Sequence, residues 1–284
     1  MLIVTTVAML RTEIANARSN GKTIGFVPTM GALHAGHIGL VERSVSENEY
    51  NVVSIFVNPT QFNNAGDLAK YPRTIEADAL LLEKAGCDLI FAPGIDDMYS
   101  ENEKNNRFEF DFEGLDTVME GKFRPGHFNG VVQIVSKLFT LVQPHKSYFG
   151  EKDFQQLSII HLMTKNLGFE IEIIDCPIVR EASGLAMSSR NERLSAQQRE
   201  IAAGISKALF QSQQLAAKTS PTELKSWVEN EIAKIEGLQL EYFEIVDAKT
   251  LQTANNWSSA TVGCIAVFCG EVRLIDNIRY RFNS

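Results

Sequence analysis

The chain has 284 residues, of which 44% are hydrophobic and 22% are charged, as expected for a globular protein with one large or two medium domains. Its formal net charge of -8 argues against a general nucleic-acid binder, because phosphate backbones attract positively charged surfaces. No apolar run approaches the roughly 18 residues that a membrane helix needs, and the N-terminus lacks the basic segment of a signal peptide. We therefore expect a cytoplasmic protein with neither a nucleic-acid nor a membrane partner.

Four cysteines are present, at positions 87, 176, 264 and 269. No two of them form a C-x-x-C pair, and their spacing matches no zinc-binding pattern. We interpret them as small buried residues in a reducing compartment, and we expect no protein-bound metal site.

Short apolar runs alternate with amphipathic stretches over the first 175 residues. The N-terminal residues read as a strand followed by a helix. Further strands are predicted at residues 23–28, 51–57, 88–92 and 171–175, and helices at 74–86, 128–142 and 153–167. Gly86 suits the C-terminal cap of the first of these helices. Strands separated by helices indicate βαβ units and a parallel sheet, so this part of the chain is predicted to be α/β.

The pattern changes in the last third of the chain. Two helices are predicted at residues 195–214 and 221–236, with Ser195 and Ser220-Pro221 as their starting signals. Strand-like runs follow at 240–246, 264–268 and 272–275. Helices followed by strands predict a smaller α+β domain. We place the boundary near Cys176-Pro177, which gives domains of residues 1–176 and 177–284.

The most informative segment is GFVPTMGALHAGHIGL, at residues 25–40. A strand leads into a loop of small residues, and a helix begins at His34-Ala35-Gly36-His37. A helix N-terminus beyond a parallel strand suits phosphate, and two imidazoles one turn apart can donate hydrogen bonds to it. Spacing alone leaves other interpretations open, namely ordinary surface or core histidines, or half of a metal site whose third ligand is not nearby in the sequence.

Three further segments carry polar groups after predicted strands. Asn58 and Gln61, in NPTQF, suit hydroxyl or amide recognition, although a solvent-facing turn explains them equally. In SYFGEKDFQQ, Lys152 is placed to reach a phosphate, and Asp153 to cap a helix or to contact a ribose or an amine. A solvated charge cluster is the alternative there.

The last of these segments is Met187-Ser188-Ser189-Arg190, which combines two hydroxyls with a guanidinium and therefore suits an oxyanion. A basic helix cap is the alternative. Additional cations that could form a local positive pocket in this acidic chain are Lys122, Arg124, Lys152, Arg180 and Arg193.

Taken together, these segments resemble the pantothenate synthetase (pantoate–β-alanine ligase) family. His34-Ala35-Gly36-His37 and Met187 to Arg190 are similar to the two phosphate-binding motifs of the wider nucleotidyltransferase superfamily, and alone they imply only that superfamily. Ordered motifs from residue 1 to near the C-terminus narrow the resemblance to the family: PTMGALHAGH (28–37), NPTQF (58–62), YPRT (71–74), GKFRPGHFN (121–129), YFGEKDFQQ (148–156), PIVRE (177–181) and RLIDN (273–277).

The resemblance implies a Rossmann-like N-terminal domain, a C-terminal lid domain, a homodimer, and ATP with Mg²⁺. The implied reaction is the condensation of pantoate with β-alanine through pantoyl-adenylate. The residues that match the family's catalytic groups are His34, His37, Lys152, Ser188, Ser189 and Arg190. Those that match its ATP site are Met30, Gly31, Ala32, Leu33, His34, Ala35, Gly36, His37, Gly150, Glu151, Lys152, Asp153, Val179, Met187, Ser188, Ser189 and Arg190. Those expected to bind pantoate or β-alanine are Asn58, Gln61 and Gln156.

The chain departs from the family pattern at Ala35, at Ser183 and in the stretch from Asn63 to Asp67, whose composition differs from the usual one. Ala35 stands where an acidic residue is common, and Ser183 stands where an aspartate is common. Two other functions stay open on the motifs alone. One is a nucleotidyltransferase that moves AMP onto a phosphate ester, and the other is a non-catalytic nucleotide-binding module.

Overall fold

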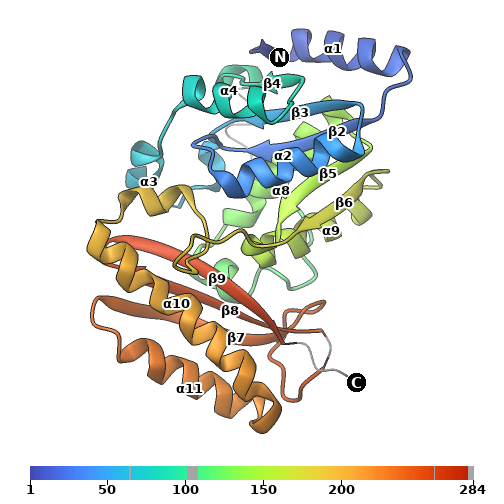
Figure 1. The fold of residues 1–284 in the computed structure, drawn as a ribbon. Helices are drawn as coiled ribbons and strands as arrows, with labels where there is room; N and C mark the ends of the chain where they lie inside the picture. The colour runs from blue at the N-terminus through green and yellow to red at the C-terminus, as the bar shows by residue number, and fades with distance from the viewer. Residues whose placement is uncertain (64, 101–107, 259, 281–284) are drawn as a thin grey trace. The chain divides into compact units, whose positions relative to one another are not determined.

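The computed structural model describes residues 1–63, 65–100, 108–258 and 260–280, and the chain divides into two compact units. The first unit contains residues 1–114, 124–151 and 159–176. The second contains residues 115–123, 152–158 and 177–284, so two short pieces of the N-terminal half belong to it. Figure 1 shows the elements of both units.

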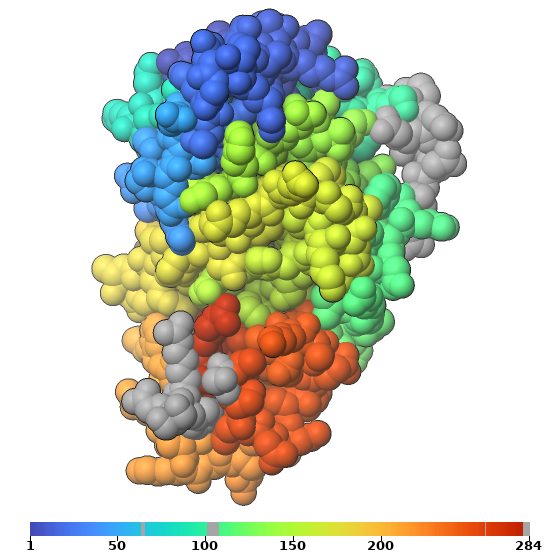
Figure 2. Space-filling view, turned by 90° about the vertical axis from the view of Figure 1, so that its right-hand side faces the viewer, coloured from blue at the N-terminus to red at the C-terminus, as the bar shows by residue number. Residues whose placement is uncertain are grey.

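A parallel six-stranded sheet with the order β1-β4-β3-β2-β5-β6 forms the centre of the first unit. Every pairing in it is parallel, which confirms the predicted α/β class. Its strands are β1 (Leu2–Val4), β2 (Ile24–Thr29), β3 (Tyr50–Ile55), β4 (Leu89–Phe91), β5 (Lys146–Gly150) and β6 (Glu172–Cys176). β6 is an edge strand whose charged Glu172 and Asp175 are exposed, and it lies in the yellow part of the surface in Figure 2.

The helices of this part of the chain are α1 (Val7–Ser19), α2 (Ala35–Glu47), α3 (Ala65–Lys70), α4 (Ile75–Lys84), α5 (Ile95–Met98), α8 (His127–Val142) and α9 (Phe154–Asn166). Neighbouring residues of a strand point to opposite faces of the sheet. Val27 packs in the cluster that contains Val41 of α2, whereas Phe26 meets the ring of Phe139 on α8 with 6.4 Å between centroids. Helices therefore cover both faces, as in a Rossmann-like fold.

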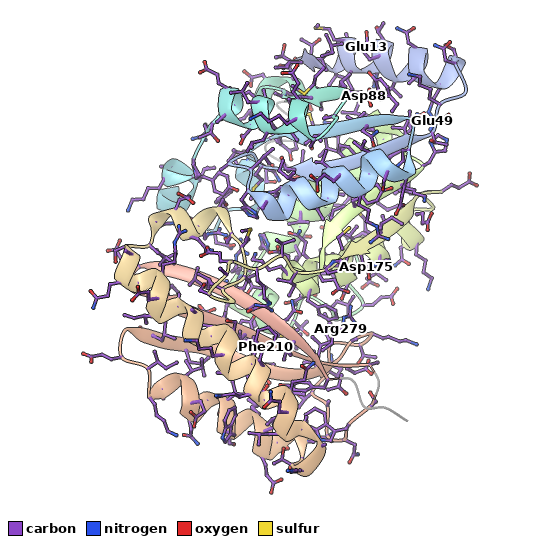
Figure 3. All side chains as sticks on the ribbon, in the orientation of Figure 1. Glu13, Glu49, Asp88, Asp175, Phe210 and Arg279 are labelled. Carbon is purple, nitrogen blue, oxygen red and sulfur yellow. The ribbon has the colours of Figure 1, made fainter. Side chains whose placement is uncertain are left out.

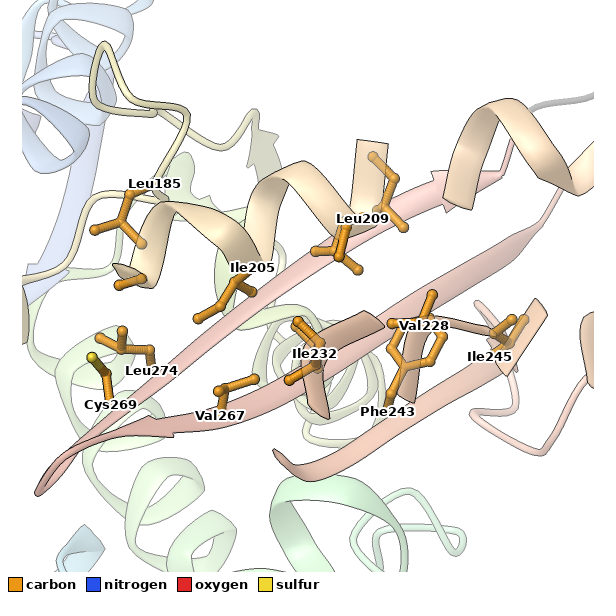
Figure 4. Packing of buried hydrophobic residues seen from close by; sticks show 14 of the residues in the cluster. Leu185, Ile205, Leu209, Val228, Ile232, Phe243, Ile245, Val267, Cys269 and Leu274 are labelled. Carbon is orange, nitrogen blue, oxygen red and sulfur yellow. The ribbon is translucent and has the colours of Figure 1, made fainter. Parts of the chain in front are cut away.

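The second unit contains a three-stranded antiparallel sheet with the order β7-β8-β9. Its elements are α7 (Met119–Phe123), α10 (Ala196–Leu215), α11 (Pro221–Ala233), β7 (Leu238–Asp247), β8 (Thr261–Cys269) and β9 (Val272–Tyr280). Apolar side chains of α10 and α11, including Leu209 and Ile232, pack against those of the sheet, including Phe243 (Figure 4). Ser195 and Ser220 cap the two helices as the sequence predicts, each in a capping box that satisfies free backbone N–H groups.

Candidate active site

The strand order of the first unit places a switch point between β2 and β5. After β2 the chain adds β3 and β4 on one side, and β5 and β6 then extend the sheet on the other side. Phe26 pairs with Ser147, and each strand continues three residues beyond that pair, to Thr29 and to Gly150. The loop that begins at Met30 and the turn that begins at Gly150 therefore leave the same edge of the sheet, where ligands bind in open α/β folds.

The two predicted histidines form the start of helix α2. His34 is its N-cap, and the Nδ1 atom of His34 accepts a hydrogen bond of 3.1 Å from the backbone N–H of Gly36. The backbone N–H of His34 in turn donates to Nδ1 of His37 at 3.4 Å, so the pair makes a capping box built from imidazoles. A neutral imidazole that accepts through Nδ1 carries its proton on Nε2. The cap therefore orients both rings, 4.1 Å apart, as Nε2–H donors.

A buried carboxylate holds the loop before His34. The side chain of Asp78, on α4, is 1% exposed, and its two oxygens accept from the backbone N–H groups of Ala32 at 3.0 Å and Leu33 at 2.8 Å. Gly31 and Ala32 both have positive φ angles, 81° and 51°. A positive φ is unfavourable for alanine, so these charge-assisted hydrogen bonds offset the cost of the loop conformation.

Asn58 and Gln61 lie close to this loop. The amide of Gln61 donates to Sδ of Met30 at 2.9 Å, and its oxygen accepts from Asn58 at 3.4 Å. Asn58 is 1% exposed, donates to the carbonyl oxygen of Gly130 at 3.0 Å and accepts from the hydroxyl of Tyr99 at 2.8 Å. The structure therefore brings Gln61 to the edge of the loop, while the side chain of Asn58 mainly joins the turn to α8 and Tyr99.

The second unit contains the other predicted site residues except Gly150 and Glu151, and the first of them along the chain is Lys152. The Nζ atom of Lys152 lies 3.3 Å from the carboxylate of Asp153. Burial opposes charge on Asp153, but the neighbouring ammonium of Lys152 outweighs it, and the pKa of Asp153 falls below its usual value. Gln156 follows on the first turn of α9.

Met187 to Arg190, which we call the serine–arginine motif, are joined to Val179 by a backbone hydrogen bond. The N–H of Met187 donates to the carbonyl oxygen of Val179 at 3.0 Å. Ser188 then caps a short 3₁₀ helix (Ser189–Arg193) by accepting from the N–H of Arg190 at 3.2 Å. Val179 and the motif are therefore adjacent in space as well as in the predicted site.

The family model for pantoate–β-alanine ligase matches residues 2–279 of the chain. The chain belongs to the pantoate–β-alanine ligase family. It is 58% identical over 283 residues to the pantothenate synthetase of Bacteroides fragilis, with 99% of each chain covered. The crystal structure of pantothenate synthetase from Thermus thermophilus is 42% identical, with a TM-score of 0.93 and coverage of 99% of this chain and 100% of that one.

A second solved relative was crystallised with ligands. The pantoate–β-alanine ligase of Francisella tularensis, in complex with β-γ ATP and β-alanine, is 36% identical to this chain. Its TM-score is 0.82, and the match covers 99% of this chain and 98% of that one. The family model and the relatives thus confirm the family that the ordered sequence motifs predict.

The predicted site residues divide between the two units. Met30 to His37, Asn58, Gln61, Gly150 and Glu151 belong to the first unit, and Lys152, Asp153, Gln156, Val179 and Met187 to Arg190 belong to the second. Within the first unit Gln61 contacts Met30, and within the second Met187 is hydrogen-bonded to Val179.

Two of the departures from the family pattern, Ala35 and Ser183, lie at exposed positions. Ala35 is the first residue of α2, where an acidic side chain would gain only a fraction of a kcal/mol to about 1 kcal/mol from the helix dipole. Ser183 lies in a turn, and its hydroxyl oxygen accepts from the N–H of Leu185 at 3.4 Å. A carboxylate oxygen could accept the same hydrogen bond, so the substitution preserves the role of the side chain.

Arg180 does not supply positive charge in the way the sequence suggested. Its guanidinium makes two hydrogen bonds, of 2.6 and 2.9 Å, to the carboxylate of Asp276, which is 4% exposed. It also donates to the carbonyl oxygen of Gly184 at 3.0 Å. The carboxylate compensates the charge of Arg180, so its contribution is to structure.

Within the described residues, no group of three or more His, Cys, Asp or Glu side chains could hold a metal ion. The four cysteines are buried and unpaired with one another, and burial raises the pKa of the Cys87 thiol to about 12. None of the helices in the described part of the chain combines the length and hydropathy that a bilayer span requires.

Sequence reasoning missed Asp78 and His127. The Nδ1–H of His127 donates to the carbonyl oxygen of Gln61 at 2.8 Å, and its side chain is buried. His127 lies within the GKFRPGHFN motif, and this position in a family motif could have identified it as a site residue. Asp78 lies on the buried side of an amphipathic helix. A charged residue there departs from the apolar pattern, and this departure could have identified Asp78 from the sequence.

Proposed function

We propose that the chain catalyses the ATP-dependent condensation of pantoate with β-alanine, through pantoyl-adenylate, to give pantothenate, AMP and pyrophosphate. The observation that carries the proposal is the pair of capping imidazoles at the switch point of the sheet, in a chain of the pantoate–β-alanine ligase family. The ligand complex of the Francisella tularensis relative supports the same substrate class.

In the first step, the pantoate carboxylate attacks the α-phosphorus of ATP. The bond from that phosphorus to the α,β-bridging oxygen breaks, and pyrophosphate leaves with the electron pair. Negative charge increases on the phosphate oxygens, so fixed hydrogen-bond donors lower the barrier more than they strengthen ground-state binding. His34 and His37 are proposed to supply such donors from Nε2, while the backbone of Met30 to Gly36 accommodates the nucleotide.

Lys152, Ser188, Ser189 and Arg190 are proposed as the cationic and hydroxyl donors to the phosphates. Gly150, Glu151, Asp153, Val179 and Met187 complete the proposed ATP site. We further propose that residues 1–176 are the ATP- and pantoate-binding domain and that residues 177–284 are a lid domain.

In the second step, the amine of β-alanine attacks the acyl carbon of pantoyl-adenylate. AMP leaves with the electrons of the acyl–oxygen bond, and the new amide nitrogen loses a proton. Gln61 and Gln156 are proposed to hold pantoate, with Gln61 also near β-alanine. Asn58 is proposed to act here mainly by orienting Gln61, because its side chain contacts the amide of Gln61.

Mg²⁺ is part of the proposal as a companion of ATP. Mg²⁺ commonly binds through substrate phosphates and water, with only one or two protein carboxylates. When bound, it would neutralise phosphate charge.

The direct test is an assay of AMP release with purified protein. AMP should appear only when ATP, pantoate and β-alanine are all present. Release of pyrophosphate without AMP, in the presence of a phosphate ester, would instead indicate a nucleotidyltransferase. Binding of ATP without turnover of the two substrates would indicate a non-catalytic module.

The adenylation step is tested separately by isotope exchange. Oxygen-18 in the α,β-bridging position of ATP should scramble into non-bridging positions when only pantoate and Mg²⁺ are added, because pyrophosphate forms, rotates and returns. His37→Ala should abolish scrambling and synthesis together. Scrambling that survives in His37→Ala while synthesis is lost would assign His37 to the second step.

A homodimer and a cytoplasmic location complete the proposal, and both rest on the family to which the chain belongs. Light scattering of the purified protein should give twice the mass of 31.6 kDa. Fractionation of the source cells should recover the activity with the cytoplasmic marker enzymes.

A further inference from the structure

Strand β9 carries an aspartate on its apolar face. Residues 272, 274, 276, 278 and 280 alternate along the strand, and four of them, all except Asp276, belong to the buried core beneath α10 and α11. Asp276 is nevertheless 4% exposed, so a charged group lies where the pattern calls for an apolar one. A residue that breaks the local pattern of a strand often serves a site nearby.

On this face, Asp276 holds the hairpin that carries Val179 and Met187. Its carboxylate makes the two hydrogen bonds to Arg180, and Arg180 also donates to the carbonyl oxygen of Gly184. The guanidinium of Arg180 lies over the ring of Phe210 on α10, at 4.9 Å from the centroid (Figure 3 labels Phe210). The hairpin is thus attached to β9 and α10 immediately beside the serine–arginine motif.

The opposite face of β9 holds the short segment that contains Lys152. Asn277, which is 4% exposed, donates from its side-chain amide to the carbonyl oxygen of Lys152 at 3.0 Å. Arg279, two residues along the same face, is labelled in Figure 3, and its guanidinium lies over the ring of Phe154, 5.2 Å from the centroid. Since side chains of neighbouring strand residues point to opposite faces, Asp276 and Asn277 reach two different segments from one rigid element.

We propose that Asp276 and Asn277 are positioning residues, which fix Lys152 relative to Val179 and the Met187–Arg190 motif. This inference rests on the proposed function, because those segments are its proposed phosphate-binding groups. Neither residue is proposed to touch substrate. Donors to a transferring phosphoryl group must be placed to within a fraction of an ångström, and misplacement by about 1 Å can lower turnover about a hundredfold.

Stability alone does not account for the pair. A buried ion pair such as that of Asp276 with Arg180 is often no more stabilising than apolar residues of the same volume, and the other residues on this face of β9 are apolar. A positioning role explains why polar side chains occupy adjacent buried positions and why each of them contacts a segment of the proposed site.

The test uses the full-length chain and three single variants. Asn277→Ala removes the hydrogen bond to Lys152, and Asp276→Asn replaces one carboxylate oxygen that accepts from Arg180. Ser212→Ala is the matched control. It removes a buried hydrogen bond of 2.8 Å from Ser212, on α10, to Tyr280, which is on β9 but contacts neither the Lys152 segment nor the Val179 hairpin. Turnover, the KM for ATP and the urea midpoint are measured for each variant.

We expect Asn277→Ala and Asp276→Asn to lower turnover about ten- to a hundredfold, whereas Ser212→Ala keeps wild-type turnover with a similar or larger decrease in urea midpoint. A double-mutant cycle then tests whether Asn277 acts through Lys152. In the Lys152→Ala background, Asn277→Ala should cost less than about threefold, because the group that it positions is already absent.

Wild-type turnover in Asn277→Ala would overturn the inference. An equal relative decrease in turnover from Asn277→Ala in the wild-type and the Lys152→Ala backgrounds would also overturn it. So would a loss of activity in Ser212→Ala equal to that in Asn277→Ala, because stability would then explain all three. A wild-type chain that released no AMP would refute the proposed function instead. In that case the same variants are compared for ATP affinity by calorimetry, where Asn277→Ala must weaken binding more than Ser212→Ala for the inference to stand.

Discussion

Substitutions at His34 can separate its role as a helix cap from its proposed role as a phosphate donor. His34→Asn keeps a side-chain oxygen that can accept from the N–H of Gly36, because asparagine is among the best N-cap residues. It removes the imidazole and with it the Nε2–H donor. His34→Ala removes the cap and the donor together.

The structure gives the expected size of each effect. The cap hydrogen bond to Gly36 is 3.1 Å long, within the normal range, whereas the reciprocal one to His37 is 3.4 Å and therefore weak. The cap then contributes about 1 kcal/mol, so His34→Ala should be less stable than His34→Asn by roughly that amount. Loss of one preorganised donor should lower turnover about a hundred- to a thousandfold in both variants.

Turnover is measured as AMP release, adenylation as oxygen-18 scrambling, and stability as urea unfolding. Ser220→Ala is the control, because it removes the capping box of α11 in the second unit, with a similar loss of stability and wild-type turnover. Near-normal turnover in His34→Asn would refute the donor role and leave His34 as a cap. Equal stability of His34→Asn and His34→Ala would refute the cap.

Three further predictions concern other residues. Asp78→Asn should lower stability by about 1–3 kcal/mol in urea unfolding and should also lower turnover. The reason is that the new amide NH₂ would face a backbone N–H that now donates to the carboxylate. Full activity would show that the loop holds its shape without the charge. Lys152→Ala should lower turnover about a hundredfold with less than about 1 kcal/mol of stability lost, and near-normal AMP release would exclude Lys152 from the site. Hydrogen bonds from Lys146 and then Arg43 lower the pKa of Glu47 to about 2, below its ordinary 4.5. Its ion pairs therefore stabilise the fold above about pH 4.5 and are lost as the pH falls toward 2. The difference in unfolding free energy between wild type and Glu47→Gln, about 1–2 kcal/mol at pH 7, should therefore decrease to zero over that range. A difference that stays constant with pH would contradict this prediction.

Most helices and strands of the fold could be predicted from the sequence, because capping residues and hydrophobic periodicity are local features. Ser195 and Ser220-Pro221 marked helix starts by residue type, and both helices begin there. A run of β-branched residues located β3, and a strand-like apolar run located β8. The predicted and observed ends differ by a few residues, since strand ends depend on pairing. The short helices α3, α5 and α7 were not predicted, because fewer than two turns give no periodic pattern.

The candidate site was also predicted from the sequence where one segment carries the chemistry. The strand, small-residue loop and histidine pair of residues 25–40 are contiguous, so residue order alone indicated a phosphate-binding turn. The identity of the family followed in the same way, from ordered motifs spread over nearly the whole chain.

Only the tertiary structure decided which residues hold that chemistry in place. Asp78 reaches Ala32 and Leu33 across 46 and 45 residues of sequence, and Asn277 reaches Lys152 across 125. The same contacts assigned Arg180 to Asp276 rather than to an open positive pocket. The sequence determines residue types and local periodicity, but the partner of a buried charge depends on which distant segments the fold brings together, and that is set by packing.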